Sequence, residues 1–268
     1  MAKHPARATR RNLRGHGYSP CHGIGRQTAL DLIRGGHRVV VHARTDQRAE
    51  QVRAAVPGMA GVVVGDLASL AETRAVAEAA KGLAEYDVII HNAGVGGAEQ
   101  RRVTDDGFEH IFQVNVLAPY LLTCLMPAPA RLVYLASGLE AHGTAHLNDL
   151  QFERRPWNGR QAYSDSKLWD VVLAFAVARH WPGTLSNAVD PGWIKTRMGG
   201  AGASEELPAG ADTPVWLATS DDPAATVTGR YFKRRRELPA NPAAYEVEVQ
   251  EGFLQAAARL TRVLLPHG

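Results

Sequence analysis

Beyond about residue 20, hydrophobic positions alternate between short apolar runs and longer stretches with helical spacing. The short runs, most of them rich in apolar or β-branched residues, lie at 38–42, 61–65, 87–91, 131–136, 185–189 and 229–232. Runs of this length are typical of strands buried on both faces. The helical patterns between and after them cover 24–35, 70–83, 107–126, 161–179 and 242–265. This alternation predicts an α/β fold, with one doubly wound parallel sheet covered by helices on both faces.

The chain length suits one large domain rather than several, because 268 residues can enclose a single sizeable core. We expect this domain to span residues 23–241, with residues 242–268 adding a C-terminal helix packed on it. Residues 1–22 form an atypical basic segment. Two stretches lack regular periodicity: residues 139–159, which we expect to act as a substrate lid, and the glycine-rich residues 199–210, which suggest a mobile flap.

Composition excludes several classes of protein. The chain is 45% hydrophobic and 21% charged, and it has no apolar run of the roughly 18 residues that a membrane-spanning helix needs. Its net charge of +3 comes without the aromatic clusters or binding modules of nucleic-acid proteins, so we expect no nucleic-acid partner. The two cysteines, Cys21 and Cys124, lack the spacing of a metal site or a disulfide framework. We expect no bound metal and a cytoplasmic location.

The candidate chemistry begins with Tyr163 and Lys167, four residues apart in the 161–179 helix. Residues at this spacing share one helical face. A lysine ammonium beside a phenol favours the ionised phenol by Coulomb attraction, so the pair could transfer a proton. The same spacing also arises by chance in many helices, and the pair alone does not establish catalysis.

Polar and glycine residues at the predicted strand ends support a functional interpretation. In a parallel sheet, ligands bind beside the carboxyl ends of the strands. Glycines at the start of the first helix would let its N-terminus approach a phosphate, and an arginine at the end of the second strand would favour a 2′-phosphate. The residues at these places are Gly23, Ile24, Gly25, Arg44, Asp66, Leu67, Asn92, Ala93, Gly94 and Ser137. Asn115 lies inside the 107–126 helix.

Taken in chain order, these segments resemble the short-chain dehydrogenase/reductase family, from about residue 23 to residue 232. The resemblance implies a Rossmann-like fold and a catalytic tetrad of Asn115, Ser137, Tyr163 and Lys167. In this tetrad the tyrosine would transfer a proton to or from the reacting oxygen, which the serine would orient. The lysine would hold the nicotinamide ribose, and the asparagine would position a water. The hydride belongs to the nicotinamide.

The same resemblance implies the cofactor and substrate contacts. Asp66 and Leu67 would lie at the adenine end and Asn92 to Gly94 beside the adenosine ribose, while the nicotinamide carboxamide would meet Pro191, Gly192, Trp193, Ile194 and Thr196. Arg44 matches members that prefer NADP, with NAD as the alternative. The 139–159 insert is similar to that of retinol-dehydrogenase-like members and indicates a small or lipophilic alcohol or carbonyl substrate. The candidate substrate residues are Leu139, Trp157, Trp193 and Met198. A homodimer or homotetramer is compatible with the family.

The chain departs from the family pattern before Gly23. Where the family has an apolar first strand, this sequence has Arg11, Arg14 and His16, and burying such groups in the centre of a sheet costs several kcal/mol each. We therefore expect a degenerate or irregular first strand, with an altered reading frame upstream of Gly23 as one hypothesis. Ser19 replaces the first glycine of the cofactor turn, and its Cβ would crowd a pyrophosphate.

Three functions remain open on the sequence alone. The leading hypothesis is an NADP-dependent oxidoreductase with Tyr163 as acid and base. The second is a non-catalytic relative with impaired cofactor binding that acts as a binding or regulatory module. A sugar-nucleotide epimerase or dehydratase shares the Tyr163 and Lys167 spacing, but too little chain follows the sixth strand for its larger substrate-binding part.

Overall fold

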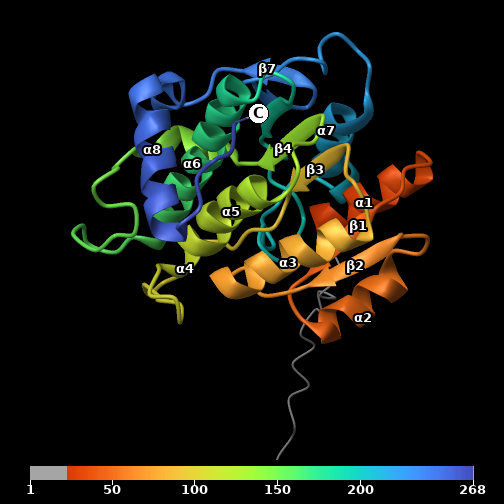
Figure 1. Ribbon diagram of the computed structural model, residues 1–268, viewed down its shortest axis with the longest axis horizontal. Helices are drawn as coiled ribbons and strands as arrows, with labels where there is room; N and C mark the ends of the chain where they lie inside the picture. The colour runs from red at the N-terminus through yellow and green to blue at the C-terminus, as the bar shows by residue number, and fades with distance from the viewer. Residues whose placement is uncertain (1–22, 268) are drawn as a thin grey trace, which may run out of the picture.

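Parallel strands form the centre of the structure, a computed structural model in which residues 23–267 are described. A two-stranded sheet pairs β1 with β2, and a five-stranded sheet runs in the order β3-β4-β5-β6-β7 (Figure 1). Every pairing is parallel except β6 with β7. The strands are β1 Val40–Ala43, β2 Gly61–Val64, β3 Val88–His91, β4 Arg131–Leu135, β5 Leu185–Val189, β6 Tyr231–Lys233 and β7 Arg236–Leu238.

The six predicted strands correspond to β1 to β6, with ends shifted by up to two residues. The seventh strand, β7, was not predicted. Its residues Arg236, Glu237 and Leu238 include one apolar side chain, and the strand pairs only with β6 at the edge of the sheet. A short edge strand that faces solvent carries no apolar run to reveal it.

The helices cover the two faces of the sheet. They are α1 Ile24–Arg34, α2 Asp46–Ala55, α3 Leu70–Leu83, α4 His110–Phe112, α5 Ala118–Leu125, α6 Gly159–His180, α7 Leu207–Thr219 and α8 Val247–Thr261. A π-helical turn, Gln113–Leu117, joins α4 to α5, and 3-10 turns lie at Gly138–His142 and Pro242–Tyr245. α1 and α7 pack together on one face, while α3, α5 and α6 cover the other and α8 packs outside α6 (Figure 1).

Two helices were not predicted, and one predicted helix begins later than expected. α2 was not predicted because it is largely polar and buries only Ala49. α7 begins at Leu207, so the irregular stretch placed at 199–210 ends four residues earlier, and the two prolines of this helix concealed it. The helix expected from residue 107 begins at His110, because the Glu109 carboxylate caps it by accepting hydrogen bonds from the backbone N–H groups of Ile111 and Phe112.

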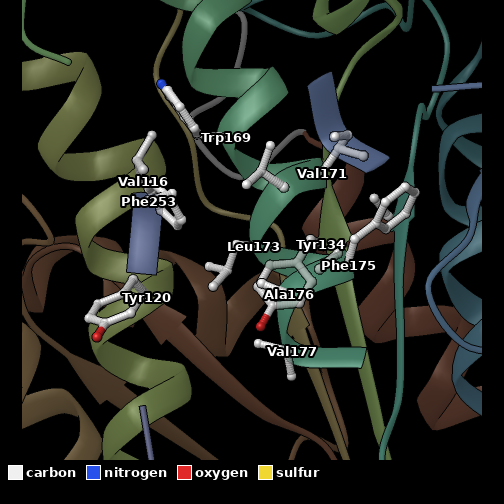
Figure 2. Close-up of a cluster of buried hydrophobic side chains, with 14 of the residues drawn as sticks. Val116, Tyr120, Tyr134, Trp169, Val171, Leu173, Phe175, Ala176, Val177 and Phe253 are labelled. Atoms are coloured by element: carbon white, nitrogen blue, oxygen red, sulfur yellow. The ribbon is translucent and has the colours of Figure 1, made fainter. Parts of the chain in front are cut away.

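The main core lies between α5, α6, α8 and β4 (Figure 2). Trp169 of α6 stacks on Phe253 of α8 with ring centroids 5.1 Å apart, and Tyr120 of α5 meets the same phenyl ring edge-on at 6.3 Å. Because α6 is covered by strands on one side and by α8 on the other, its side chains are buried almost continuously from Ser164 to Val177. This packing fixes the helix that carries the candidate proton-transfer pair.

β1 and β3 are not paired with each other. Within residues 23–267 each has one hydrogen-bonded neighbour, β2 for β1 and β4 for β3, and Val41 of β1 and Ile90 of β3 border the same cavity. The irregular first strand expected before Gly23, like Ser19, lies outside the described residues. None of the helices in the described range is long and apolar enough to cross a bilayer.

Candidate active site

The carboxyl ends of the parallel strands border one large cavity. Its volume of about 1090 Å³ lies slightly above the ~300–1,000 Å³ range of small-molecule sites, and its lining also reaches the amino ends of the strands near Arg38, Asp87 and Arg131. The cavity brings together residues that are far apart in the sequence. Among the predicted site residues, it is lined by Gly23, Ile24, Gly25, Arg44, Asp66, Leu67, Asn92, Ala93, Gly94, Tyr163, Lys167, Pro191, Thr196 and Met198.

Tyr163 and Lys167 lie one turn apart on α6, and both border the cavity. The helix begins at Gly159 because Asn158 caps it, accepting a hydrogen bond from the Gln161 backbone N–H at 3.0 Å. The Lys167 Nζ atom lies 5.8 Å from the centroid of the Tyr163 ring, and the Tyr163 hydroxyl donates to the Met198 Sδ atom at 3.8 Å. The structure therefore places an ammonium beside a phenol at the edge of a cavity.

Lys167 is only 5% exposed and is held by two hydrogen bonds. Its Nζ donates to the Leu135 carbonyl oxygen at the end of β4 and to the Asp170 carboxylate, each at 2.8 Å. Burial alone would lower the pKa of Lys167, but the negative charge of Asp170 and the neighbouring Tyr163 phenol outweigh it and raise that pKa. The lysine is thus protonated at neutral pH.

Asn115 lies close to Lys167, since both side chains lie within 4 Å of where a Cβ on Gly94 would be, but neither Asn115 nor Ser137 is among the described residues that line the cavity. Asn115 sits in the π-helical turn, where its amide Nδ2 donates to the Val95 carbonyl at 3.0 Å and to the Ser166 hydroxyl at 2.9 Å, while its Oδ1 accepts from the Val95 N–H at 2.8 Å. It therefore ties the loop after β3 to α6. Ser137 follows β4, and its hydroxyl accepts a hydrogen bond from the Leu139 N–H at 3.3 Å.

The N-terminus of α1 approaches Asn92 at the other end of the cavity. A Cβ atom on Gly25 would lie 2.5 Å from the Asn92 Nδ2 atom, a separation that side chains do not adopt, so this contact requires glycine. Gly23, the N-cap residue, makes no side-chain capping bond, and a helix N-terminus of this kind can bind an anion through its first backbone N–H groups.

Arg44 and Asp66 border the same part of the cavity. They follow β1 and β2, and the Arg44 Nε atom lies 3.9 Å from an Asp66 carboxylate oxygen. Both side chains are substantially exposed, 61% for Arg44 and 39% for Asp66. Their mutual attraction is therefore weak, because solvent screens it, and the guanidinium can turn toward a ligand.

The segment after β5 lies across the cavity from α1. Gly192 adopts a φ of +94°, and a Cβ there would approach the Glu205 carboxylate to 2.6 Å, so glycine is needed for the turn. Ile194 is buried, while the Trp193 indole is 56% exposed and donates to the Gly199 carbonyl at 3.0 Å. The Thr196 hydroxyl accepts a hydrogen bond from the Gly199 N–H at 3.0 Å.

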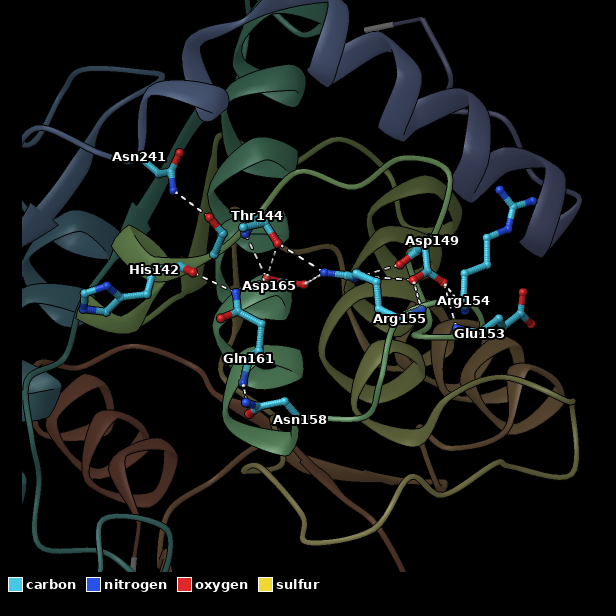
Figure 3. A network of polar contacts seen from close by, with 11 residues as sticks. His142, Thr144, Asp149, Glu153, Arg154, Arg155, Asn158, Gln161, Asp165 and Asn241 are labelled. Carbon is cyan, nitrogen blue, oxygen red and sulfur yellow. Dashed lines mark hydrogen bonds and ion pairs between the residues drawn. The ribbon is translucent and has the colours of Figure 1, made fainter.

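The loop expected to be a lid is tied to the body of the protein by Arg155 (Figure 3). This guanidinium binds Asp149 at 2.9 Å and Asp165 of α6 at 3.1 Å, and both carboxylates are buried. The Asp149 carboxylate also accepts three backbone N–H groups, from residues 153 to 155. Arg155 therefore joins the loop at Asp149 to helix α6 at Asp165.

The two substrate candidates of this loop occupy different places. Trp157 packs edge-on against Phe152, with ring centroids 5.5 Å apart, and its indole N–H donates to the Ala98 carbonyl at 3.2 Å. Leu139 lies in the 3-10 turn that follows Ser137. Met198, by contrast, touches the Tyr163 hydroxyl directly.

Asp170 is the site residue that the sequence did not reveal. It is 4% exposed, and burial raises its pKa to about 6 even though the Lys167 charge opposes the shift. Its sequence signal is an acidic residue three positions after the lysine, on the same helical face. Such pairs occur on many solvent-exposed helices, so the spacing does not distinguish a buried ion pair from a surface one.

A dinucleotide is compatible with these residues. The glycine contact at Gly25 and the N-terminus of α1 are the kind of surroundings that can hold a pyrophosphate. A Cβ on Gly94 would lie 3.5 Å from the Lys167 Nζ atom, so glycine keeps space open above the ammonium. The polar groups that could hold the cofactor thus occur at both ends of the cavity.

Comparisons with known proteins agree with this geometry. Residues 20–136 match the family model described as short chain dehydrogenase. The chain is 38% identical to Short-chain dehydrogenase chyC of Penicillium rubens, over 91% of this chain and 95% of the relative. It is 33% identical to human Retinol dehydrogenase 14, over 85% of this chain and 80% of that protein.

Solved structures show the same fold. An uncharacterized protein from Mycobacterium paratuberculosis is 25% identical and superposes with a TM-score of 0.80, over 92% of each chain. A blue fluorescent protein from a metagenomic library, solved in complex with NADPH, is 24% identical with a TM-score of 0.63, over 79% of this chain and 92% of its own. The sequence relatives and the shared architecture establish that this chain is an NAD(P)-dependent oxidoreductase and belongs to the short-chain dehydrogenase/reductase family.

Proposed function

We propose that the protein transfers a hydride between NADP and a small or lipophilic alcohol or carbonyl compound, with Tyr163 as the acid and base. The observation that carries this proposal is that Tyr163 and Lys167 lie one turn apart on α6 and border the cavity. Gly25 and Asn92 border the same cavity at its other end. A proton donor and a dinucleotide cradle thus share one cleft.

In the reductive direction the phenolic proton of Tyr163 passes to the carbonyl oxygen of the substrate, and in oxidation the phenolate takes it back. The Ser137 hydroxyl orients and polarises the same oxygen. Lys167, as an ammonium, stabilises the phenolate and holds the nicotinamide ribose. When bound, the nicotinamide supplies or accepts the hydride at the substrate carbon. Asn115 keeps the loop after β3 fixed beside the lysine.

Arg44 supports a preference for NADP over NAD. It ends the strand beside which an adenosine ribose lies in this fold, and its exposed guanidinium is a bidentate donor suited to a 2′-phosphate. We further propose that Asp66, Leu67 and Asn92 to Gly94 contact the adenosine half. The remaining cofactor contacts would be Gly23, Ile24, Gly25, Pro191, Gly192, Trp193, Ile194 and Thr196.

A lipophilic substrate is supported by an apolar side chain at the cavity. Met198 is 52% exposed, borders the cavity and touches the Tyr163 hydroxyl. Large exposed apolar groups beside a reacting centre offer binding surface for an apolar ligand. Trp193, which is 56% exposed, Leu139 and Trp157 are further candidates. We place the enzyme in the cytoplasm as a homodimer or homotetramer, its C-terminal residues 242–268 forming one domain with residues 23–241.

The test is turnover of a panel of apolar aldehydes, ketones and alcohols with NADPH or NADP, comparing the native chain with Tyr163→Phe. We expect the variant to lose at least ~100-fold in kcat, the usual scale of a general acid, while the Kd for NADPH measured by calorimetry changes less than about threefold. Retained turnover would refute the role of the phenol. Absence of NADPH binding to the native chain at millimolar concentration would favour the non-catalytic binding module.

A further inference from the structure

Lys167 has an ionic partner that its assigned role does not require. Two of the three N–H groups of its ammonium are directed to Leu135 and Asp170, so one is left for the cleft beside Gly94 and Tyr163. The Asp170 carboxylate lies on the side of the lysine away from Tyr163, because it follows Lys167 by three residues and Tyr163 precedes it by four. The ammonium therefore lies between the phenol and a buried carboxylate.

Because Lys167 is buried, its protonation depends strongly on the negative charge of Asp170. A lysine removed from water without a counterion loses its proton readily, and its pKa can fall by several units. Desolvation is the largest influence on the pKa of Lys167, and Asp170 is the first influence that opposes it. Within the described part of the chain, Asp170 is the carboxylate that forms an ion pair with Lys167.

The other titratable groups behind Lys167 carry no compensating charge at neutral pH. Burial raises the pKa of Tyr134 on β4 and that of Cys124 on α5, so both stay protonated and neutral. Burial also lowers the pKa of His91 on β3 to about 4, so the imidazole is neutral as well.

We propose that Asp170 is a positioning residue that keeps Lys167 protonated and holds its Nζ atom at the floor of the cleft. The proposal rests on the function assigned to Tyr163, since only a charged Lys167 stabilises the phenolate. A neutral amine at the same place would still donate a hydrogen bond but would lack the charge–charge attraction that stabilises a phenolate. Asp170 thereby acts on the reaction through the lysine, without touching substrate or cofactor.

The protonation state of Lys167 can be measured without substrate or cofactor. Only the unprotonated amine reacts with acetic anhydride, and the chain has five lysines, which simplifies peptide mass spectrometry: Lys3, Lys81, Lys167, Lys195 and Lys233. At pH 8 we expect Lys167 of the full-length native chain to acetylate far more slowly than Lys81. In Asp170→Asn, which keeps the shape but loses the charge, the rate at Lys167 relative to Lys81 should rise at least tenfold, equivalent to about one pKa unit.

Two variants separate this role from a purely structural one. Asp165→Asn makes the same substitution on the same helix, at a buried carboxylate that binds Arg155 and Thr144 instead of Lys167, and should leave the Lys167 rate within about twofold of native. Asp170→Glu keeps the negative charge. On a logarithmic scale, its Lys167 acetylation rate should differ from the native rate by no more than half of the change seen in Asp170→Asn. If Asp170→Asn does not fold, as judged by circular dichroism, the comparison of Asp170→Glu with native, expected within about threefold, decides. An unchanged Lys167 rate in Asp170→Asn, or an equal rise in Asp165→Asn, would overturn the proposal.

The outcome is independent of the proposed enzyme activity. If Tyr163→Phe keeps its turnover while acetylation follows Asp170, the function assigned to the phenol fails but the role of Asp170 as counterion stands. Where turnover is measurable, Asp170→Asn should lower kcat at pH 6 to 8 and displace its pH profile relative to Asp165→Asn. An identical pH profile in the two variants would contradict an action through Lys167.

Discussion

Arg44 is the side chain on which the choice between the two dinucleotides is expected to depend. Replacing it with alanine removes a charged donor from the ribose end of the cleft, and hydrogen bonds to charged groups contribute ~1.5–3 kcal/mol. We therefore expect Arg44→Ala to raise the Kd for NADPH about 10- to 100-fold and the Kd for NADH less than threefold, as measured by calorimetry.

The matched control for this charge change is Arg53→Ala. Arg53 is half-exposed and lies on the neighbouring helix α2, where it pairs with Glu50. It does not border the cavity formed by the described residues. Equal weakening of both cofactors by Arg44→Ala, or an equal effect of Arg53→Ala on NADPH, would show that the guanidinium of Arg44 does not meet a 2′-phosphate.

For single residues, the sequence predicts side-chain neighbours within one helix, but it does not predict roles that depend on burial by other elements. The Tyr163 and Lys167 spacing directly predicts a shared helical face, and both residues border the cavity. The importance of Asp170 depends on β4 and the neighbouring helices excluding water from α6. No local pattern reports that exclusion, so the same acidic residue could have been a solvated surface group.

Among the larger elements, the loop of residues 143–158 depends on one guanidinium. Removing it in Arg155→Met leaves Asp149 and Asp165 buried without their cationic partner, and breaking a buried pair in this way costs about 3–5 kcal/mol. We expect that loss of unfolding free energy in urea titrations at pH 7. Arg154→Met is the control, because Arg154 is exposed at the adjacent position, and similar losses in the two variants would contradict the anchoring role.

The same variant has a defined pH dependence. Burial raises the pKa of Asp149, but the hydrogen bonds from Arg155 and from three backbone N–H groups outweigh it and hold that pKa below its usual value. Its contribution to stability is therefore present above the ordinary aspartate pKa of ~3.9 and is lost as pH falls through the lower folded value. Arg155→Met should lose less stability than the native chain as the pH falls, because it removes the Arg155 hydrogen bond that lowers the pKa of Asp149.

Apolar patterns explain why some elements were predicted and others were not. The bounds of β4, Arg131–Leu135, were predicted to within one residue, because a strand covered on both faces appears as a continuous apolar run. α2 and β7 lie at the surface and have few buried side chains, so their formation depends on capping and edge pairing. The Thr45 cap of α2, which accepts a hydrogen bond from the Arg48 N–H at 3.3 Å, was the one local signal available.

Across the whole molecule, stability and cofactor binding are expected to depend on the sequence that precedes Gly23. β1 ends at Ala43, just before Arg44, and β3 ends at His91, just before Asn92, so the two sheets carry different parts of the dinucleotide cleft. Where the family pattern has an apolar first strand, this sequence has Arg11, Arg14 and His16. Burying such groups in the centre of a sheet costs several kcal/mol each, so we expect them to weaken both the fold and the cleft.

This coupling can be tested by changing the sequence before Gly23. The triple variant Arg11→Val, Arg14→Val and His16→Val gives that stretch the apolar, β-branched character of a buried strand. We expect its Tm to rise by about 3–6 °C, since 1 kcal/mol shifts Tm by roughly 2–4 °C at this size, and its Kd for NADPH to fall at least about fivefold. The control variant Lys3→Val, Arg7→Val removes charges farther from Gly23 and should change neither quantity. A triple variant that matches this control in both Tm and Kd would show that strand character before Gly23 does not limit the cleft.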